Sequence, residues 1–183
     1  MVKYGFYLKV MRRCDKPLGR NIAGVDVNTD RLNLVVIDEN GDIVWKYTAK
    51  FLQVTSRGYL RRRAWSIIGE AIHKVLKNAH SHGASVIAVE NPKVIGYLRY
   101  YWIRNGDRKL ENYNYKISIF RNSIIKRIMW KAPLYGLQVI AVNPKGTTHS
   151  EDHEYIMRRY GLDRHTASAY LIALKARRNL QRP

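Results

Sequence analysis

The sequence predicts an α/β domain built on a mixed five-stranded sheet, with the element order βββαβαβα and helices on both faces. Three strand-like segments stand together near the start of the chain, with an Asn-Gly turn between the second and the third. Two later segments, 84–90 and 136–142, are apolar almost throughout, as parallel strands buried on both faces are. Amphipathic segments alternate with these two strands, which is typical of crossover helices over a parallel sheet.

The first three strands are predicted to form an antiparallel meander. The segment 21–28 (NIAGVDVN) is a short apolar run, and 32–40 (LNLVVIDEN) is rich in Val, Ile and Leu. The segment 39–42 (ENGD) contains Asn-Gly, the strongest short-range signal for a hairpin. Residues 42–51 (DIVWKYTAKF) then alternate as a third strand. We expect strands one, four and five to be parallel and adjacent, with strands two and three extending one edge.

Apolar residues at helical spacing predict three helices, over 57–82, 115–131 and 164–178. The first of them carries a basic face opposite its apolar stripe. Two stretches lack a clear periodicity, namely 93–114 and the residues between Pro144 and the third helix. Both are predicted to be irregular loops.

The charge of the chain restricts its partners. There are 33 Lys and Arg against 14 Asp and Glu, a formal net charge of +19, and such a domain attracts nucleic acid or an anionic membrane surface. No apolar run approaches the roughly 20 residues that span a bilayer. A single cysteine, Cys14, excludes an internal disulfide framework and a Cys-based zinc ribbon. We expect a soluble domain over 21–183, after a basic leader or remnant of a preceding domain at 1–20.

Four side chains are candidates for a site at one end of the sheet. Asp26 lies in the first strand, and Glu90 is the last residue of the fourth. Because these strands are expected to be parallel neighbours, their carboxylates converge where sites form in open α/β sheets. Asp163 and His165, at the start of the last helix, come to the same rim. Each also has an ordinary alternative role, Asp163 as a helix N-cap and the others as structural or solvent-facing polar groups.

Converging carboxylates suit a divalent cation. Two of them about 4 Å apart repel by about 4 kcal/mol at an effective dielectric near 20, and a cation removes this repulsion. Oxygen ligands select Mg²⁺ or Mn²⁺, and two such ions can activate water and stabilise the leaving oxygen of a phosphodiester. An acidic centre in a basic protein therefore predicts a metal-dependent nuclease.

Four segments, in their order and spacing, resemble the RuvC-like nuclease domain of the OrfB/TnpB proteins carried by small insertion sequences. They are GVDVN (24–28), VIAVENP (86–92), IIKRIMWKAPLYGLQVIAVNPKGTTHS (124–150) and DRHTASAYLIALKAR (163–177). The resemblance covers roughly residues 20–178 and implies an RNase H-like fold. Type V CRISPR effectors have a similar domain, and RuvC Holliday-junction resolvases are the more distant comparison.

The resemblance implies a DNA endonuclease that uses two Mg²⁺ or Mn²⁺ ions, in a nucleoid-associated cytoplasmic protein of a prokaryote or virus. The family's catalytic set is an Asp, a Glu and a late Asp, and Asp26 and Glu90 match the first two positions. At the third, the family's Asp-x-Asp is Asp163-Arg164-His165 here. His165 therefore stands at the usual catalytic position, as in some resolvase-type domains, and Asp163 is the alternative ligand.

Two departures from the family keep other functions open. The usual four-Cys zinc ribbon is missing, and in its place His149 and His153 stand among acidic residues, which we interpret as a solvated loop rather than a metal site. Only about 20 residues precede the domain, in place of the family's large region that holds guide RNA, so use of a guide RNA is left open. The alternatives are a resolvase, which would be a homodimer, a decayed nuclease that only binds nucleic acid, and a ribosomal-type RNA binder.

Two stretches are expected to contact the nucleic acid, which we take to be single-stranded or branched DNA. The first is the basic face of the helix over 57–82, which could instead be merely solvated; its candidates are Arg61, Arg62, Arg63 and Lys74. The second is the loop 97–116, where aromatic residues and arginines interleave as in single-strand binding surfaces. Its candidates are Arg99, Tyr100, Tyr101, Trp102, Arg104 and Arg108. The alternative for this loop is that its rings pack on the sheet.

Overall fold

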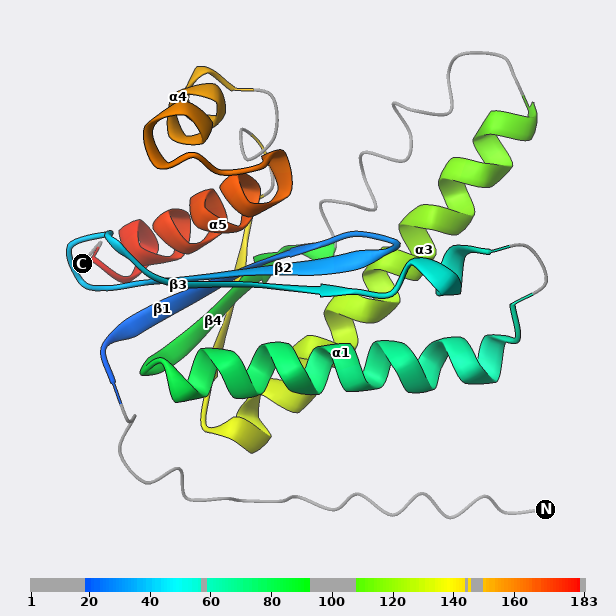
Figure 1. Ribbon diagram of the computed structural model, residues 1–183, viewed down its shortest axis with the longest axis horizontal. Coiled ribbons are helices and arrows are strands. Elements are labelled where there is room, and N and C mark those ends of the chain that lie inside the picture. Colours follow the sequence, from blue (N-terminus) through cyan, green and yellow to red (C-terminus); the bar gives the residue numbers. More distant parts are fainter. Residues whose placement is uncertain (1–18, 57–58, 93–107, 144, 146–149, 182–183) are drawn as a thin grey trace.

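The computed structural model describes residues 19–56, 59–92, 108–143, 145 and 150–181, with the side chains of 108–119 outside the description. Its centre is a mixed sheet of five strands in the order β3-β2-β1-β4-β5 (Figure 1). Pairing is antiparallel from β1 to β2 and from β2 to β3, and parallel from β1 to β4 and from β4 to β5. The strands are β1 (Asn21–Val27), β2 (Arg31–Ile37), β3 (Ile43–Lys50), β4 (Ala84–Glu90) and β5 (Gln138–Val142). The predicted sheet and its topology are confirmed.

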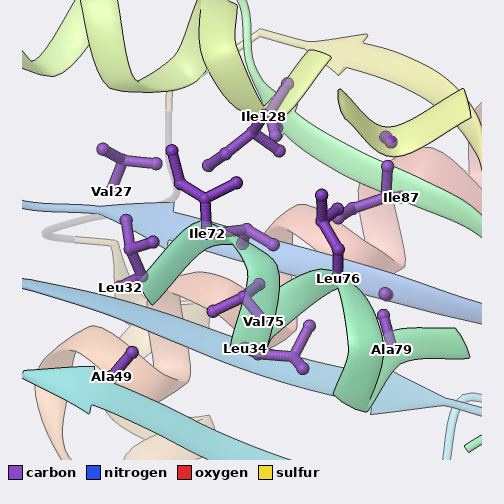
Figure 2. Packing of buried hydrophobic residues seen from close by; sticks show 14 of the residues in the cluster. Val27, Leu32, Leu34, Ala49, Ile72, Val75, Leu76, Ala79, Ile87 and Ile128 are labelled. Atoms are coloured by element: carbon purple, nitrogen blue, oxygen red, sulfur yellow. The ribbon is translucent and has the colours of Figure 1, made fainter. Parts of the chain in front are cut away.

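Helices cover both faces of the sheet, as predicted. One face carries α1 (Arg61–Ser81) and α3 (Arg108–Lys131), and the other carries α4 (Glu151–Tyr160) and α5 (Arg164–Leu180) (Figure 1). Figure 2 shows the first core, in which Ile72 and Leu76 of α1 and Ile128 of α3 pack toward Leu34 and Ile87 of the sheet. Burying one such side chain stabilises the fold by about 1.5–3 kcal/mol, so this core fixes the strands beneath it. Two short 3₁₀ helices, η1 (Leu52–Thr55) and η3 (Ala132–Tyr135), connect elements.

Strand β1 contributes alternate residues to the two cores. Val25 and Val27 lie in the core under α1 and α3, whereas Ile22 lies in the core under α5. Because successive side chains of a strand point to opposite faces, Gly24 and Asp26 are on the α5 face. Strand β1 thus carries the buried carboxylate of Asp26 on the face that α5 covers.

Helix α5 packs directly on the backbone of β1. A Cβ atom added to Gly24 would lie 2.1 Å from the carbonyl oxygen of Ala169 and 2.6 Å from the backbone nitrogen of Ala173. Only glycine allows this approach, since real Cβ atoms essentially never come within 3.0 Å of such atoms. The close packing sets the height of the first turn of α5 over the carboxyl end of β1.

The stretch before α5 was predicted to be a solvated loop, and this is wrong because it contains α4. The Ser150 side chain caps the helix by accepting a hydrogen bond from the backbone N–H of His153. Three acidic residues occupy the first turn and two arginines the last, an order that complements the helix dipole. Buried His153 and Ile156 face the second core. The charges that suggested a loop are those that stabilise the helix ends.

Two helix boundaries also differ from prediction. Helix α1 begins at Arg61 rather than at 57, and residues 59–60 are not helical. Helix α3 begins at Arg108, so residues 108–114 are helical although they were predicted to be irregular. The segment RKLENYN has no apolar stripe, so its periodicity gave no signal.

Residues 1–18 and 93–107 lie outside the description, so the division of the chain at 20/21 stays a prediction. None of the described helices is long and apolar enough to cross a membrane.

The close approach of α5 predicts that Gly24→Ala destabilises the protein. The added methyl group must push the helix away from β1, so we expect a loss of about 1–3 kcal/mol in the free energy of unfolding, the usual size for overpacking. Gly69→Ala in α1 is the matched control, because a Cβ there meets nothing within 4 Å and Ala is favoured over Gly in a helix by about 1 kcal/mol. Urea unfolding followed by circular dichroism measures both variants. Equal stability of the two would contradict the close packing at Gly24.

Candidate active site

Asp26 and His165 meet at the carboxyl end of β1. The Asp26 side chain is buried, and its Oδ2 lies 3.2 Å from Nδ1 of His165, which comes from the first turn of α5. Asn28 completes the group: its Nδ2 donates to Oδ2 of Asp26 at 2.7 Å and lies 3.0 Å from Nδ1 of His165. The sequence prediction that Asp26 and His165 share one rim of the sheet agrees with this geometry.

The neighbouring carboxylate raises the pKa of His165. The hydrogen bond to Asp26 is the largest cause, and partial burial of the imidazole opposes it. A histidine must be neutral to bind a metal ion, so a cation at Nδ1 has to displace the interaction with Asp26. The His165 side chain is 37% exposed, which leaves the ring accessible to an ion or a substrate from solvent.

Glu90 lies on the strand next to Asp26 and is held by an arginine. Val25 pairs with Val89 in the parallel ladder, so Asp26 and Glu90 are the following residues of adjacent strands. Alternation along β4 places Glu90 on the same face as Ala88, which lies in the core under α5. The Glu90 side chain is 6% exposed, and its Oε2 accepts a hydrogen bond of 3.2 Å from Nη2 of Arg121 on α3.

A second cation lies within electrostatic range of Glu90. Lys175 on α5 donates to the backbone carbonyls of Asn143 and Lys145, just after β5. Burial lowers the pKa of Lys175, and the charge of Glu90 opposes that shift. Glu90 is thus flanked by one cation from each helical layer, and neither was identified from the sequence.

Asp163 acts as the N-cap of α5. Its Oδ1 accepts hydrogen bonds from the backbone N–H groups of His165 and Thr166, at 3.0 and 3.2 Å, and its Oδ2 accepts one from the Thr166 hydroxyl at 2.5 Å. Burial acts to raise the pKa of Asp163, but these hydrogen bonds outweigh it and hold the pKa below its ordinary value. Both oxygens of Asp163 therefore have partners within its own helix.

The donor set fits a hard divalent cation, although it is not assembled as a closed cage. Within the described ranges, no three His, Cys, Asp or Glu side chains are close enough together to hold one metal ion. Asp26 and His165 are in contact, whereas Glu90 is bonded to Arg121. The two carboxylates are ligands that suit Mg²⁺ or Mn²⁺, whereas the imidazole is a less usual ligand for these ions. Those three residues would hold such an ion if Glu90 turned toward the other two.

The residues predicted to bind nucleic acid are only partly described. Arg61, Arg62, Arg63 and Lys74 are exposed on α1. Because α1 ends just before β4 begins, its first turn lies at the same end of the sheet as Glu90 (Figure 1). Arg108 begins α3, and its side chain is outside the description. The other loop candidates also lie outside the described residues: Arg99, Tyr100, Tyr101, Trp102 and Arg104.

Of the two histidines near α4, the structure describes only His153. His149 lies outside the described residues. His153 is buried, and its Nε2 lies 2.9 Å from the carbonyl oxygen of Arg164 and 3.2 Å from the Ser168 hydroxyl. It therefore links α4 to the first turn of α5.

Sequence reasoning missed Asn28 and Arg121, and each had a signal. Asn28 stands two residues after Asp26, so it follows the same face of the strand. Arg121 stands four residues from Ile117 and four from Ile125, which places a charged residue on the apolar stripe of its helix. A charge in such a position needs a buried partner, and here the partner is Glu90.

Comparisons with known proteins identify relatives and a fold. No family model matches the chain. Two uncharacterized proteins of Aeropyrum pernix are each 49% identical over 170 residues, or 93% of this chain, but the match spans only 46% and 41% of their lengths. An uncharacterized protein of Saccharolobus solfataricus is 35% identical over 161 residues, 87% of this chain and 42% of that protein. The chain thus spans less than half the length of these relatives.

Two solved structures share the architecture. Thermus thermophilus RuvC in complex with a Holliday junction aligns with a TM-score of 0.55 and 18% identity, over 87% of this chain and 94% of that one. A second structure of Thermus thermophilus RuvC gives a TM-score of 0.51 at 18% identity, over 86% and 96% of the two chains. The fold is therefore RuvC-like, of the RNase H type, as the sequence resemblance implied.

The capping geometry predicts that Asp163 contributes to stability through its side-chain acceptor. Asp163→Ala removes the cap and should lower the free energy of unfolding by about 1 kcal/mol. Asp163→Ser is the matched variant, since serine at an N-cap accepts the same backbone N–H bonds and is about as favourable there as aspartate, so its stability should stay close to that of the unaltered protein. Urea unfolding of the two variants measures the difference. If both lose the same stability, the side chain of Asp163 is not acting as a cap.

Proposed function

We propose that this domain is a divalent-metal-dependent nuclease that hydrolyses phosphodiester bonds in DNA. The observation that carries the proposal is the meeting of Asp26 with His165 at the carboxyl end of β1, next to the strand that ends in Glu90. The RuvC-like fold supports it, since a protein of this fold is known in complex with a Holliday junction. The net charge of +19 supplies attraction for a polyanionic substrate.

The proposed roles follow from the geometry of each side chain. Asp26, Glu90 and His165 would hold Mg²⁺ or Mn²⁺, in a site for two ions, and the ions would supply an activated water and charge stabilisation for the leaving oxygen. Asn28 fixes the Asp26 carboxylate by donating to Oδ2. Asp163 serves this site by capping α5 and so holding the backbone of His165 in place.

Substrate contacts belong to the basic residues at the same end of the sheet. The exposed arginines of the first turn of α1, Arg61 to Arg63, would follow the phosphates of the bound strand. The arginines and aromatic residues of 99–108 would supply stacking and further phosphate contacts. Affinity for DNA should then fall steeply as salt is raised.

A binding-only protein on the same fold is the second candidate. One observation favours it: Glu90 is bonded to Arg121 and near Lys175, so the carboxylate is already neutralised without a metal ion. Among nucleases, the likeness to a RuvC structure that holds a Holliday junction favours a branched substrate. A homodimer stays a prediction from the sequence. Membership of the OrfB/TnpB group, a guide RNA and a nucleoid-associated location stay predictions from the sequence.

The nuclease proposal predicts Mn²⁺-dependent cleavage that requires Asp26. Purified protein would be incubated with labelled single-stranded DNA, duplex DNA and a four-way junction, with Mn²⁺ and with EDTA. We expect Asp26→Asn to lower the cleavage rate at least about 100-fold, the usual loss when one group that stabilises transition-state charge is removed. Asp38→Asn is the control, because Asp38 accepts three backbone N–H bonds in the β2–β3 turn, at the far end of the sheet.

The substrate preference distinguishes the candidates. Preferential cutting of the junction would support a resolvase, and cutting of single strands or duplex would support an insertion-sequence nuclease. Binding of all three DNAs without cleavage, with Asp26→Asn binding as well as the unaltered protein, would contradict the nuclease proposal and favour the binding-only protein.

A further inference from the structure

Arg121 joins the carboxyl ends of β1 and β4 through one guanidinium group. Its Nε donates to the carbonyl oxygen of Val27, the last residue of β1, at 2.7 Å. Its Nη2 donates to Oε2 of Glu90, the last residue of β4, at 3.2 Å. The Arg121 side chain is 22% exposed and that of Glu90 is 6% exposed. The pair is therefore largely removed from water, where a charge-assisted hydrogen bond is stronger than at the surface.

The position of Arg121 explains why the three candidate ligands are not grouped. Asp26 and Glu90 are in successive register positions on neighbouring strands, so two negative charges are buried at one rim. Arg121 places a positive charge at that rim and bonds to Glu90 but not, among the contacts described, to Asp26. His165 bonds to Asp26 instead. The two carboxylates thus have separate partners, from helices on opposite faces of the sheet.

We propose that Arg121 is a latch on the metal site: it competes with the divalent cation for Glu90, and the site closes around the ion only when Glu90 leaves the guanidinium. This inference rests on the proposed metal-dependent function. The bond to the Val27 carbonyl keeps Arg121 attached to β1 whether or not Glu90 is bound. The latch requires the Glu90 carboxylate to turn from Arg121 toward Asp26 and His165.

A simple positioning role makes the opposite prediction. If Arg121 merely oriented Glu90 for the ion, its removal would weaken metal binding, as loss of an outer hydrogen bond to a metal ligand usually does by about 10–100-fold. If Arg121 competes for Glu90, its removal strengthens metal binding. The sign of the change therefore separates the two roles.

Calorimetric titration of the full chain with Mn²⁺ tests the latch. We expect Arg121→Gln to bind Mn²⁺ at least about fivefold more tightly than the unaltered protein. A change of about fivefold is the low end of the usual coupling between two binding interactions in one protein. Lys126→Gln is the matched control, because Lys126 is an exposed residue of the same helix and its loss changes the net charge equally. Its Mn²⁺ affinity should change less than about twofold, as expected for a distant and screened charge. In the Glu90→Gln background, Arg121→Gln should have no such effect, since the shared carboxylate is gone.

Thermal unfolding provides a second readout that does not depend on activity. Without metal, Arg121→Gln should lower the melting temperature, because it leaves the buried Glu90 carboxylate without its arginine. Saturating Mn²⁺ should then raise the melting temperature of Arg121→Gln more than that of the unaltered protein, since the tighter ligand stabilises more. If Arg121→Gln does not fold, Arg121→Lys replaces it. Lysine keeps the charge but lacks the fork that reaches both partners, so Arg121→Lys should bind Mn²⁺ more tightly than the unaltered protein does.

The outcomes separate the latch from the metal site itself. Mn²⁺ binding that requires Asp26, but that is unchanged or weaker in Arg121→Gln, would overturn the latch and leave the metal site standing. An absence of Asp26-dependent Mn²⁺ binding in every variant would overturn the proposed function and the latch with it.

Discussion

Two buried carboxylates determine how one end of this domain is held together. Asp26 and Glu90 are 4% and 5% exposed and end up beside each other on parallel strands. A buried charge without a partner costs several kcal/mol (about 3–5 when the partner is removed), so each carboxylate requires one. Asp26 takes its partner from α5 and Glu90 from α3. Each helical layer is therefore joined by an ion pair to the end of a strand, at the rim where chemistry is proposed.

The place of His165 follows from backbone constraints more than from its own side chain. Gly24 lets α5 lie against β1, and Asp163 caps the helix at the residue that starts its first turn. Buried His153 of α4 approaches the Arg164 carbonyl in that same turn. The first contact sets how closely α5 approaches β1, the second sets where α5 begins, and the third holds its first turn against α4. The imidazole of His165 consequently lies beside Asp26.

Much of this arrangement could be predicted from the sequence, because it depends on local patterns. The alternation of β1, the apolar run of β4 and the Asn-Gly turn each predict their own element, and strand order then brings Asp26 beside Glu90. Helix α4 and the choice of Glu90 as the partner of Arg121 depend on the three-dimensional context instead. A charged segment becomes a helix because its apolar residues find a core, and the pairing of Arg121 with Glu90 joins residues 31 apart. The fold prediction is confirmed, whereas the catalytic roles stay predictions.

The balance of charge at the rim links metal and substrate in the proposed function. Asp26 and Glu90 supply two negative charges, and Arg121 and Lys175 supply two positive charges close to Glu90. Coulomb repulsion from the arginine and the lysine would oppose a divalent cation that enters beside Glu90. A nucleic-acid phosphate at the same rim reverses the balance, because it pairs with the guanidinium and attracts the cation. On the proposed function, DNA and metal would therefore bind more tightly together than either does alone, because the two basic residues that oppose the cation would be paired with the phosphate.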